Sequence, residues 1–268
     1  MRLPQKTISL NHKIYSMLTE LFGEFLGTFI LILLGNGVVA NVNLKNTYGN
    51  GGGWIVITSG WGLAVFTAVF MTADLSGAHL NPAVTVGLAA AGLFSWMKVL
   101  PFILAQLLGA MFGAWMVYVF YRNQFKITDD AGAKQACFCT APAIRDLKNN
   151  FFSEMVGTFV LVLGVLLITL PEFQIEGIQS STKVGLGSLG AIPVALVVFV
   201  IGLSLGGTTG YAINPARDLG PRIVHALLPL KNKDDNGWSY SWIPVFGPVA
   251  GAFAAALVYL LISILTTP

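Results

Sequence analysis

Long apolar stretches separated by short polar segments make up most of the chain. A helix needs about 20 apolar residues to cross a bilayer, and six stretches are long enough: about 16–39, 54–74, 98–121, 150–170, 190–206 and 240–264. Two further apolar stretches, at about 81–92 and 214–226, would cover only about half of the hydrocarbon core at about 1.5 Å per residue. The pattern predicts an all-α membrane protein with six transmembrane helices and two re-entrant half-helices.

Both short stretches begin with the same three residues, Asn-Pro-Ala, at 81–83 and 214–216. Asn is a strong helix N-cap, and Pro is favoured at the first helical position. A helix that begins at membrane depth leaves polar backbone ahead of it, which is tolerated only inside protein or along a water-filled cavity. A single Asn-Pro would indicate a plain helix cap without a pore. Two of them, one in each half, indicate a central polar path.

The two halves are also related outside these segments. Residues 23–29 (Gly-Glu-Phe-Leu-Gly-Thr-Phe) match residues 153–159 (Ser-Glu-Met-Val-Gly-Thr-Phe). Each half reads as helix, helix, half-helix and helix, which predicts a single channel domain over 1–268 with one repeat at about 16–121 and a second at about 150–265. Because each half has three full spans, the second half enters the membrane from the opposite side. An inverted repeat of this kind has its site near the midplane.

The composition supports a membrane protein and narrows the chemistry. The chain is 55% hydrophobic and 10% charged, whereas a soluble domain has about a quarter charged residues. The net charge of +3 is too small to indicate nucleic acid as a partner. Cys137 and Cys139 are interpreted as free loop thiols, because no other Cys or nearby His completes a metal site. No nucleotide-binding loop or nucleophile arrangement is evident, so we expect no cofactor, no metal and no enzymatic activity.

The loop charges leave the orientation of the chain open. The basic residues ahead of the first helix favour a cytoplasmic N-terminus. Over all loops, however, this orientation puts five basic residues inside and ten outside, against the positive-inside rule. We expect a cytoplasmic N-terminus and, from the size of the chain, a location in the inner (plasma) membrane of a bacterium.

Three polar residues at the predicted centre carry the candidate chemistry. Asn81 and Asn214 are expected to donate amide N–H groups to a molecule in a central constriction. Each helix N-terminus carries about half a positive charge, which disfavours cations, and a water held by two donors cannot relay protons in both directions. Arg217 is a charge in an apolar zone, which indicates function. Its alternative role, a structural pair with Asp218, is less favoured because adjacent helical residues do not face each other. Asp218 is expected to brace the half-helix and its loop.

The irregular segments ahead of the half-helices add further polar groups. Their carbonyls are expected to form a ladder along the channel, because no helix satisfies them; these belong to Gly77, Ala78, His79, Gly210, Tyr211 and Ala212. Glu24 and Glu154 are expected to be buried acceptors for the free N–H groups of these segments. A polar helix contact without function is an equally good interpretation of the two glutamates.

The chain resembles the aquaporin, or major intrinsic protein, family, and within it the aquaglyceroporins, or glycerol facilitators. The resemblance rests on the paired Asn-Pro-Ala segments, the two Glu-x-x-Gly-Thr-Phe segments, Ala-Gln-Leu-Leu-Gly-Ala at 105–110 and Phe-Gly-Pro at 246–248. It implies a homotetramer in the lipid bilayer. Each subunit would be a passive channel for glycerol, related small neutral polyols and some water, excluding ions and protons. A water-selective channel of the same fold and, less favoured, an ion-coupled secondary transporter are the alternatives.

The resemblance also implies which residues select the solute. The positions that match the selectivity filter of aquaglyceroporins are Trp61, Gly202, Tyr211 and Arg217. Trp61 and Tyr211 would form an apolar corner for the carbon-bearing edge of a polyol, while Arg217 and backbone carbonyls would meet its hydroxyls. A small residue at position 202 leaves room for the second aromatic ring, whereas strict water channels usually have His there. Further positions match the glycerol-conducting subgroup: Tyr121, Asp218, Arg222, Pro244 and Val245.

Overall fold

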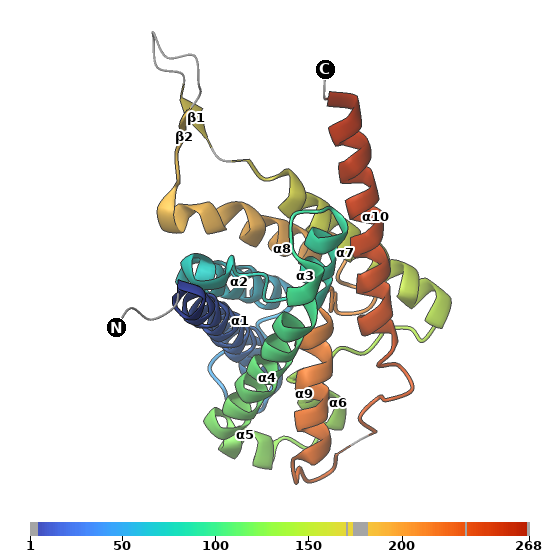
Figure 1. Cartoon of the computed structure of the whole chain (residues 1–268). Coiled ribbons are helices and arrows are strands. Elements are labelled where there is room, and N and C mark those ends of the chain that lie inside the picture. The colour runs from blue at the N-terminus through green and yellow to red at the C-terminus, as the bar shows by residue number, and fades with distance from the viewer. Residues whose placement is uncertain (1–4, 170, 174–181, 234, 267–268) are drawn as a thin grey trace.

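The computed structural model describes residues 5–169, 171–173, 182–233 and 235–266. Within these residues, six helical segments are long and apolar enough to cross a membrane. They are α1 (Gln5–Asn43), α2 (Trp54–Ser76), α4 (Trp96–Phe120), α7 (Leu147–Leu167), α8 (Ile192–Ser204) with the 3₁₀ turn η1 (Gly187–Ala191) ahead of it, and α10 (Ile243–Thr266). Two shorter helices, α3 (Pro82–Ala90) and α9 (Pro215–Leu227), begin at the two Asn-Pro-Ala segments. The predicted helical membrane fold is confirmed (Figure 1).

The half-helices begin where the capping residues predict. Asn81 and Asn214 both have extended backbones, with φ of −156° and −153°. The Oδ1 of Asn81 accepts from the N–H of Ala83 at 2.8 Å, and the Oδ1 of Asn214 accepts from the N–H groups of Ala216 and Arg217 at 3.0 and 3.1 Å. A proline occupies the first turn of each helix. These bonds satisfy donors that a helix start otherwise leaves unpaired.

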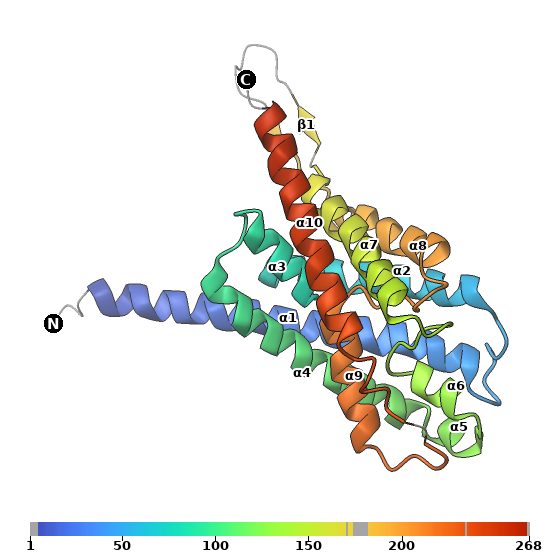
Figure 2. The same cartoon turned by 90° about the vertical axis from the view of Figure 1, so that its right-hand side faces the viewer.

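The helices pack with an internal two-fold symmetry. α1 packs along α4 in the first half, as α7 packs along α10 in the second. Each half-helix rests on the other half, α3 on α10 and α9 on α4. α2 and α8 pack against each other and join the two halves. Figures 1 and 2 show the half-helices held between the long helices. The fold therefore brings the two Asn-Pro-Ala segments together in the interior.

Glycines allow the long helices of each half to approach closely. A Cβ at Gly109 on α4 would lie 2.3 Å from the carbonyl oxygen of Phe25 on α1. The corresponding contact in the second half is 2.2 Å, between a Cβ at Gly251 on α10 and the carbonyl oxygen of Met155 on α7. Small residues at such contacts are typical of membrane helices, whose association depends on close packing. Gly109 and Gly251 therefore serve helix packing within the subunit.

The connections contain structure that the apolar pattern does not predict. The long connection after α4 forms two short helices, α5 (Arg122–Ile127) and α6 (Ala131–Ala136). The connection between α7 and α8, within the second half, contains two antiparallel strands, β1 (Glu172–Phe173) and β2 (Thr182–Lys183), with Glu172 opposite Lys183. The all-helical description therefore holds for the membrane part, and this small sheet is an addition to it. Open strands can exist outside the bilayer because water satisfies their free edges.

Candidate functional site

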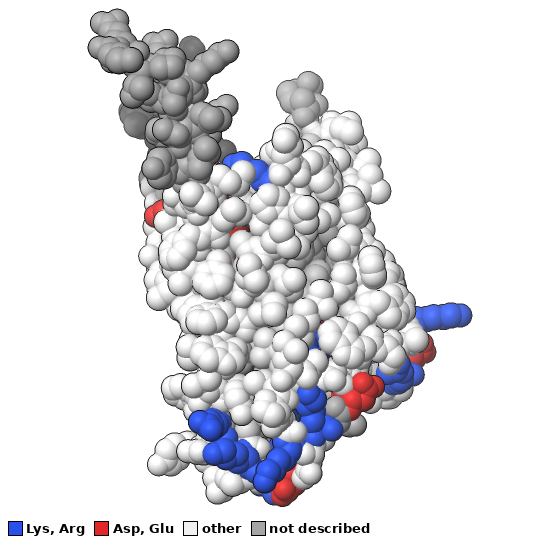
Figure 3. All heavy atoms as spheres, turned by 60° about the horizontal axis from the view of Figure 1, so that its bottom comes forward, with Lys and Arg blue, Asp and Glu red and all other residues white. Residues whose placement is uncertain are grey.

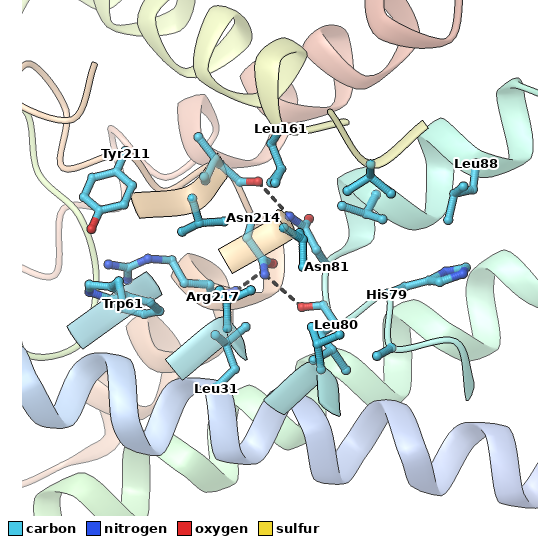
Figure 4. A pocket seen from close by; sticks show the side chains of 18 of the residues that line it. Leu31, Trp61, His79, Leu80, Asn81, Leu88, Leu161, Tyr211, Asn214 and Arg217 are labelled. Carbon is cyan, nitrogen blue, oxygen red and sulfur yellow. Dashed lines mark hydrogen bonds between the residues drawn. The ribbon is translucent and has the colours of Figure 1, made fainter. Parts of the chain in front are cut away.

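A cavity of about 240 Å³ lies between the two halves of the molecule. Figure 4 shows its lining, which comes from several helices and from the segments that lead into α3 and α9. Most of the helical lining is apolar, and its members recur at four-residue intervals, which places them on one face of each helix. They are Leu31 on α1, Val65 and Val69 on α2, Val84 and Leu88 on α3, Leu161 and Val165 on α7, and Val194 and Val198 on α8.

The polar side of the cavity is built from the two irregular segments. Four non-glycine residues in these segments have positive φ: Ala78 (50°), Leu80 (51°), Tyr211 (38°) and Ile213 (42°). Such backbones are uncommon for L-residues and persist only where the surroundings fix them. Of the residues expected to supply carbonyls, those lining the cavity are Gly77, Ala78, His79, Tyr211 and Ala212. Gly210 is not among the lining residues; its N–H donates to the carbonyl of Gly206, and a Cβ there would meet Thr140 at 3.4 Å.

Two buried glutamates hold the irregular segments in place. Glu24 accepts from the N–H groups of His79 and Leu80 at 3.0 and 2.8 Å. Glu154 accepts from the N–H groups of Ala212 and Ile213 at 2.9 and 2.8 Å. Both side chains are fully buried. The glutamates thereby satisfy N–H groups of the segments that lead into α3 and α9 and fix the backbone that lines the cavity.

The two central asparagines bond across the symmetry axis. The Nδ2 of Asn81 donates to the carbonyl of Ile213, and the Nδ2 of Asn214 donates to the carbonyl of Leu80, both at 2.8 Å (dashed lines in Figure 4). A side-chain amide has two N–H groups, so each asparagine uses one of them for this cross-bond and keeps a second. Asn81 and Asn214 both line the cavity. We call these two bonds the reciprocal asparagine bonds.

Three of the four expected filter residues meet at one end of the cavity. Trp61, Tyr211 and Arg217 all line it, and Figure 4 shows them gathered on one side of Asn81 and Asn214. The guanidinium carbon of Arg217 lies 4.2 Å above the centre of the Trp61 ring, in a cation–π contact. Among the described residues, the Nη1 of Arg217 has no hydrogen-bond partner. One donor of Arg217, a residue that lines the cavity, is therefore open to an acceptor.

Gly202 does not line the cavity but lies behind Tyr211. A Cβ at Gly202 would be 2.9 Å from both Cζ and Oη of the Tyr211 ring. This distance is shorter than atoms in contact allow, so a larger residue would push the ring toward the cavity. The Tyr211 ring can occupy its position because Gly202 has no side chain.

A buried ion pair braces the half-helix beside this end of the cavity. Asp218 accepts from the Nε of Arg222 at 2.8 Å, and its second oxygen accepts from the N–H and the hydroxyl of Thr140 at 2.8 and 2.7 Å. Arg222 also donates to the carbonyls of Thr140, Asn236 and Gly237. Both charged side chains are fully buried. The pair ties two outer loops to α9, and Asp218 bonds to Arg222 rather than to Arg217.

The neighbouring cysteines are buried and free. The thiol of Cys137 donates to the carbonyl of Ala133 at 3.1 Å. Burial raises the pKa of both thiols, that of Cys139 to about 12. A thiol with a raised pKa is a poor nucleophile and a poor metal ligand, so the two cysteines contribute packing to the loop.

The symmetry of the backbone is not matched by the side chains. Asn81 and Asn214 are 133 positions apart (214 − 81), and the same offset relates many lining residues. Applied to the four filter positions Trp61, Gly202, Tyr211 and Arg217, it gives Val194, Val69, Ala78 and Val84. All four of these counterparts line the cavity. The two ends therefore share a backbone design, but the counterparts of Trp61, Tyr211 and Arg217 are the small apolar residues Val194, Ala78 and Val84.

Gln106 is a site residue to which the sequence pattern assigned no role. It is fully buried on α4, and its Nε2 donates to Glu24 at 2.7 Å and to Thr85 at 2.9 Å. The hydroxyl of Thr85 also lies 3.1 Å from the Nδ1 of His79. A polar residue at the centre of an apolar span is a signal that could have identified it.

Comparisons with known proteins place the chain in a family. The family model described as "Major intrinsic protein" matches residues 11–259. The "Glycerol uptake facilitator protein" of Streptococcus pneumoniae is 54% identical over 243 residues, covering 91% of this chain and 99% of the relative. The "Probable glycerol uptake facilitator protein" of Thermotoga maritima is 52% identical over 236 residues, covering 88% and 96%.

A solved structure agrees with these relatives. The X-ray structure of the aquaglyceroporin from Plasmodium falciparum matches with a TM-score of 0.76 and 35% sequence identity, covering 91% of this chain and 95% of that one. The fold, the paired half-helices and the sequence likeness agree over most of the chain. This protein therefore belongs to the major intrinsic protein family, as an integral, multi-pass membrane protein.

Proposed function

We propose that this protein is a passive channel for glycerol and related small neutral polyols, with some conduction of water. The observation that carries the proposal is the cavity with one apolar wall and one polar side. A polyol has a carbon-bearing edge and a hydroxyl-bearing edge, so it matches both sides at once. The names of the bacterial relatives and the aquaglyceroporin neighbour support the same solute.

Selection of the solute is assigned to Trp61, Tyr211 and Arg217, with Gly202 behind them. The two rings give the carbon edge an apolar corner, and Arg217 donates to hydroxyls on the opposite edge. The lining carbonyls accept from the same hydroxyls as the solute moves along the segments 77–79 and 211–212. Each hydroxyl thereby exchanges its water partners for protein partners, which keeps the cost of leaving water small.

Exclusion of ions and protons is assigned to the centre and to Arg217. The N-termini of α3 and α9 meet at Asn81 and Asn214, and each brings partial positive charge. The second N–H of each amide donates to a passing water or hydroxyl, which orients that molecule as an acceptor. A cation meets a positive field at the centre and at Arg217, and the lining residues that the structure describes include no carboxylate to replace its hydration.

We also propose the assembly and the location. The chain forms one channel domain with repeats at about 16–121 and 150–265. It assembles as a homotetramer in the plasma membrane of a bacterium, with a cytoplasmic N-terminus. The named relatives are bacterial glycerol facilitators, which supports the location. Figure 3 shows Lys and Arg gathered at the end formed by α5, α6 and the loop after α9, beyond a wide uncharged band. This end would face outward, and protease access to an N-terminal tag in sealed vesicles checks the orientation.

A swelling assay on proteoliposomes tests the proposed function. Vesicles with the purified protein should admit glycerol much faster than empty vesicles, and they should admit water and urea as well. Water flux without glycerol flux would favour a water-selective channel. Glycerol uptake accelerated by a sodium or proton gradient would favour an ion-coupled transporter.

A further inference from the structure

The ring of Tyr211 is held by residues that lie outside the cavity lining. A Cβ at Gly202 or at Gly206 would fall within 2.9 or 2.5 Å of atoms of Tyr211, so the backbone at the end of α8 lies directly against the ring. On another side, the ring of Trp54 makes an edge contact with Tyr211, with centroids 5.7 Å apart and planes at 79°. Tyr211 itself is 6% exposed and faces the cavity. Its position in the filter therefore depends on α8 and on Trp54.

Trp54 also bonds to the backbone that supports Tyr211. It is the first residue of α2, and its Nε1 donates to the carbonyl of Gly202 at 2.9 Å. Gly202 lies in the last turn of α8, where carbonyls lack partners within the helix. One indole from the first half thus caps the end of a helix of the second half and contacts the ring that the helix supports.

Trp54 lies outside the lining of the cavity, whereas Trp61, seven residues later on the same helix, is part of it. We propose that Trp54 is a positioning residue that sets the width of the filter by fixing Tyr211 and the end of α8. This inference rests on the proposed function, because it concerns the same filter.

Loss of the indole leaves space on the side of Tyr211 that faces away from the cavity. One hydrogen bond and one aromatic edge contact each change the population of a side-chain position by about fivefold. Without them, the Tyr211 ring should move away from its position often enough to widen the filter. Four-carbon polyols should gain more than glycerol. A tryptophan that only anchors the helix in the membrane interface would not alter this preference.

The test measures the ratio of erythritol to glycerol permeability in proteoliposomes, for equal amounts of reconstituted protein. Trp54→Leu should raise the ratio at least about threefold, given the two lost contacts. Trp54→Phe keeps a ring edge but loses the donor, so it should give a smaller rise. Trp96→Leu is the matched control, since Trp96 is the first residue of α4, is 55% exposed and is absent from the cavity lining. It should leave the ratio unchanged.

A double-mutant cycle tests whether the effect passes through Tyr211. In the Tyr211→Leu background the ring is gone, so adding Trp54→Leu should change the ratio no further. An equal rise in that background, or an unchanged ratio in both Trp54 variants of a chain that conducts glycerol, would overturn this inference alone. If Trp54→Leu does not fold, the smaller rise in the permeability ratio expected for Trp54→Phe still tests the inference. A wild-type chain that conducts no polyol would overturn the proposed function, and the inference with it.

Discussion

Gly35 on α1 controls the position of Trp61 from outside the cavity, and a single methyl group there should narrow the filter. A Cβ at Gly35 would lie 2.3 Å from Cζ3, 2.4 Å from Cε3 and 2.5 Å from Cη2 of the Trp61 ring. These distances fall more than about 1 Å short of an ordinary carbon contact. In Gly35→Ala the ring must therefore move away from α1, toward Arg217 and the cavity that it lines.

The size of the effect follows from two opposing contributions. Overpacking a well-filled interior costs about 1–3 kcal/mol, while Ala in place of Gly stabilises a helix by about 1 kcal/mol. The folded protein should therefore persist. If about 1 kcal/mol of the overlap is relieved by movement of the ring into the filter, a solute that fills the filter crosses about five times more slowly. Water is smaller than glycerol and should be slowed less.

The neighbouring Gly37 provides a matched control on the same helix. A Cβ at Gly37 meets nothing within 4 Å, so Gly37→Ala has the same gain in helix propensity without the overlap. Stopped-flow light scattering of proteoliposomes, with glycerol and with an impermeant osmolyte, measures the two fluxes for each variant. Equal glycerol permeability in Gly35→Ala and Gly37→Ala would refute the link between α1 and the filter.

Three further substitutions test other parts of the site. Gly202→His should reduce glycerol flux far more than water flux, because its side chain would displace Tyr211; equal losses in swelling assays would count against the filter assignment. Arg222→Met should lower the free energy of unfolding by about 3–5 kcal/mol, because it leaves the charge of Asp218 buried and unpaired. Thermal unfolding in detergent measures this loss, and a melting temperature equal to that of the wild type would contradict it. Lys233→Met should loosen the end of α9, since Lys233 donates to the carbonyls of residues 225, 226 and 228; unchanged amide exchange in the following loop would argue against that role.

The sequence predicts the membrane architecture well because that architecture depends on apolar length and on helix caps. The starts of α3 and α9 follow from Asn-Pro-Ala, since the capping chemistry is local. The filter positions required a family resemblance, because Trp61 lies far in sequence from Gly202 and Arg217 and their meeting depends on tertiary packing. No residue type marks Leu80 or Ile213 for a left-handed backbone, so their conformations could not be anticipated. The helices α5 and α6 and the strands β1 and β2 lie in polar connections, where apolar periodicity carries no information.

The reciprocal asparagine bonds have a consequence for the making of the protein. The first half of the chain is synthesised well before Ile213 and Asn214. During that interval the amide of Asn81 and the carbonyl of Leu80 lack the hydrogen-bond partners that they have in the folded protein. While only the first half of the chain is in the bilayer, these groups must bond to water or to other temporary partners, because polar groups without hydrogen bonds in lipid are costly. The pore can close around its final geometry only when the last third of the polypeptide arrives, which makes assembly of the centre a late event in biogenesis.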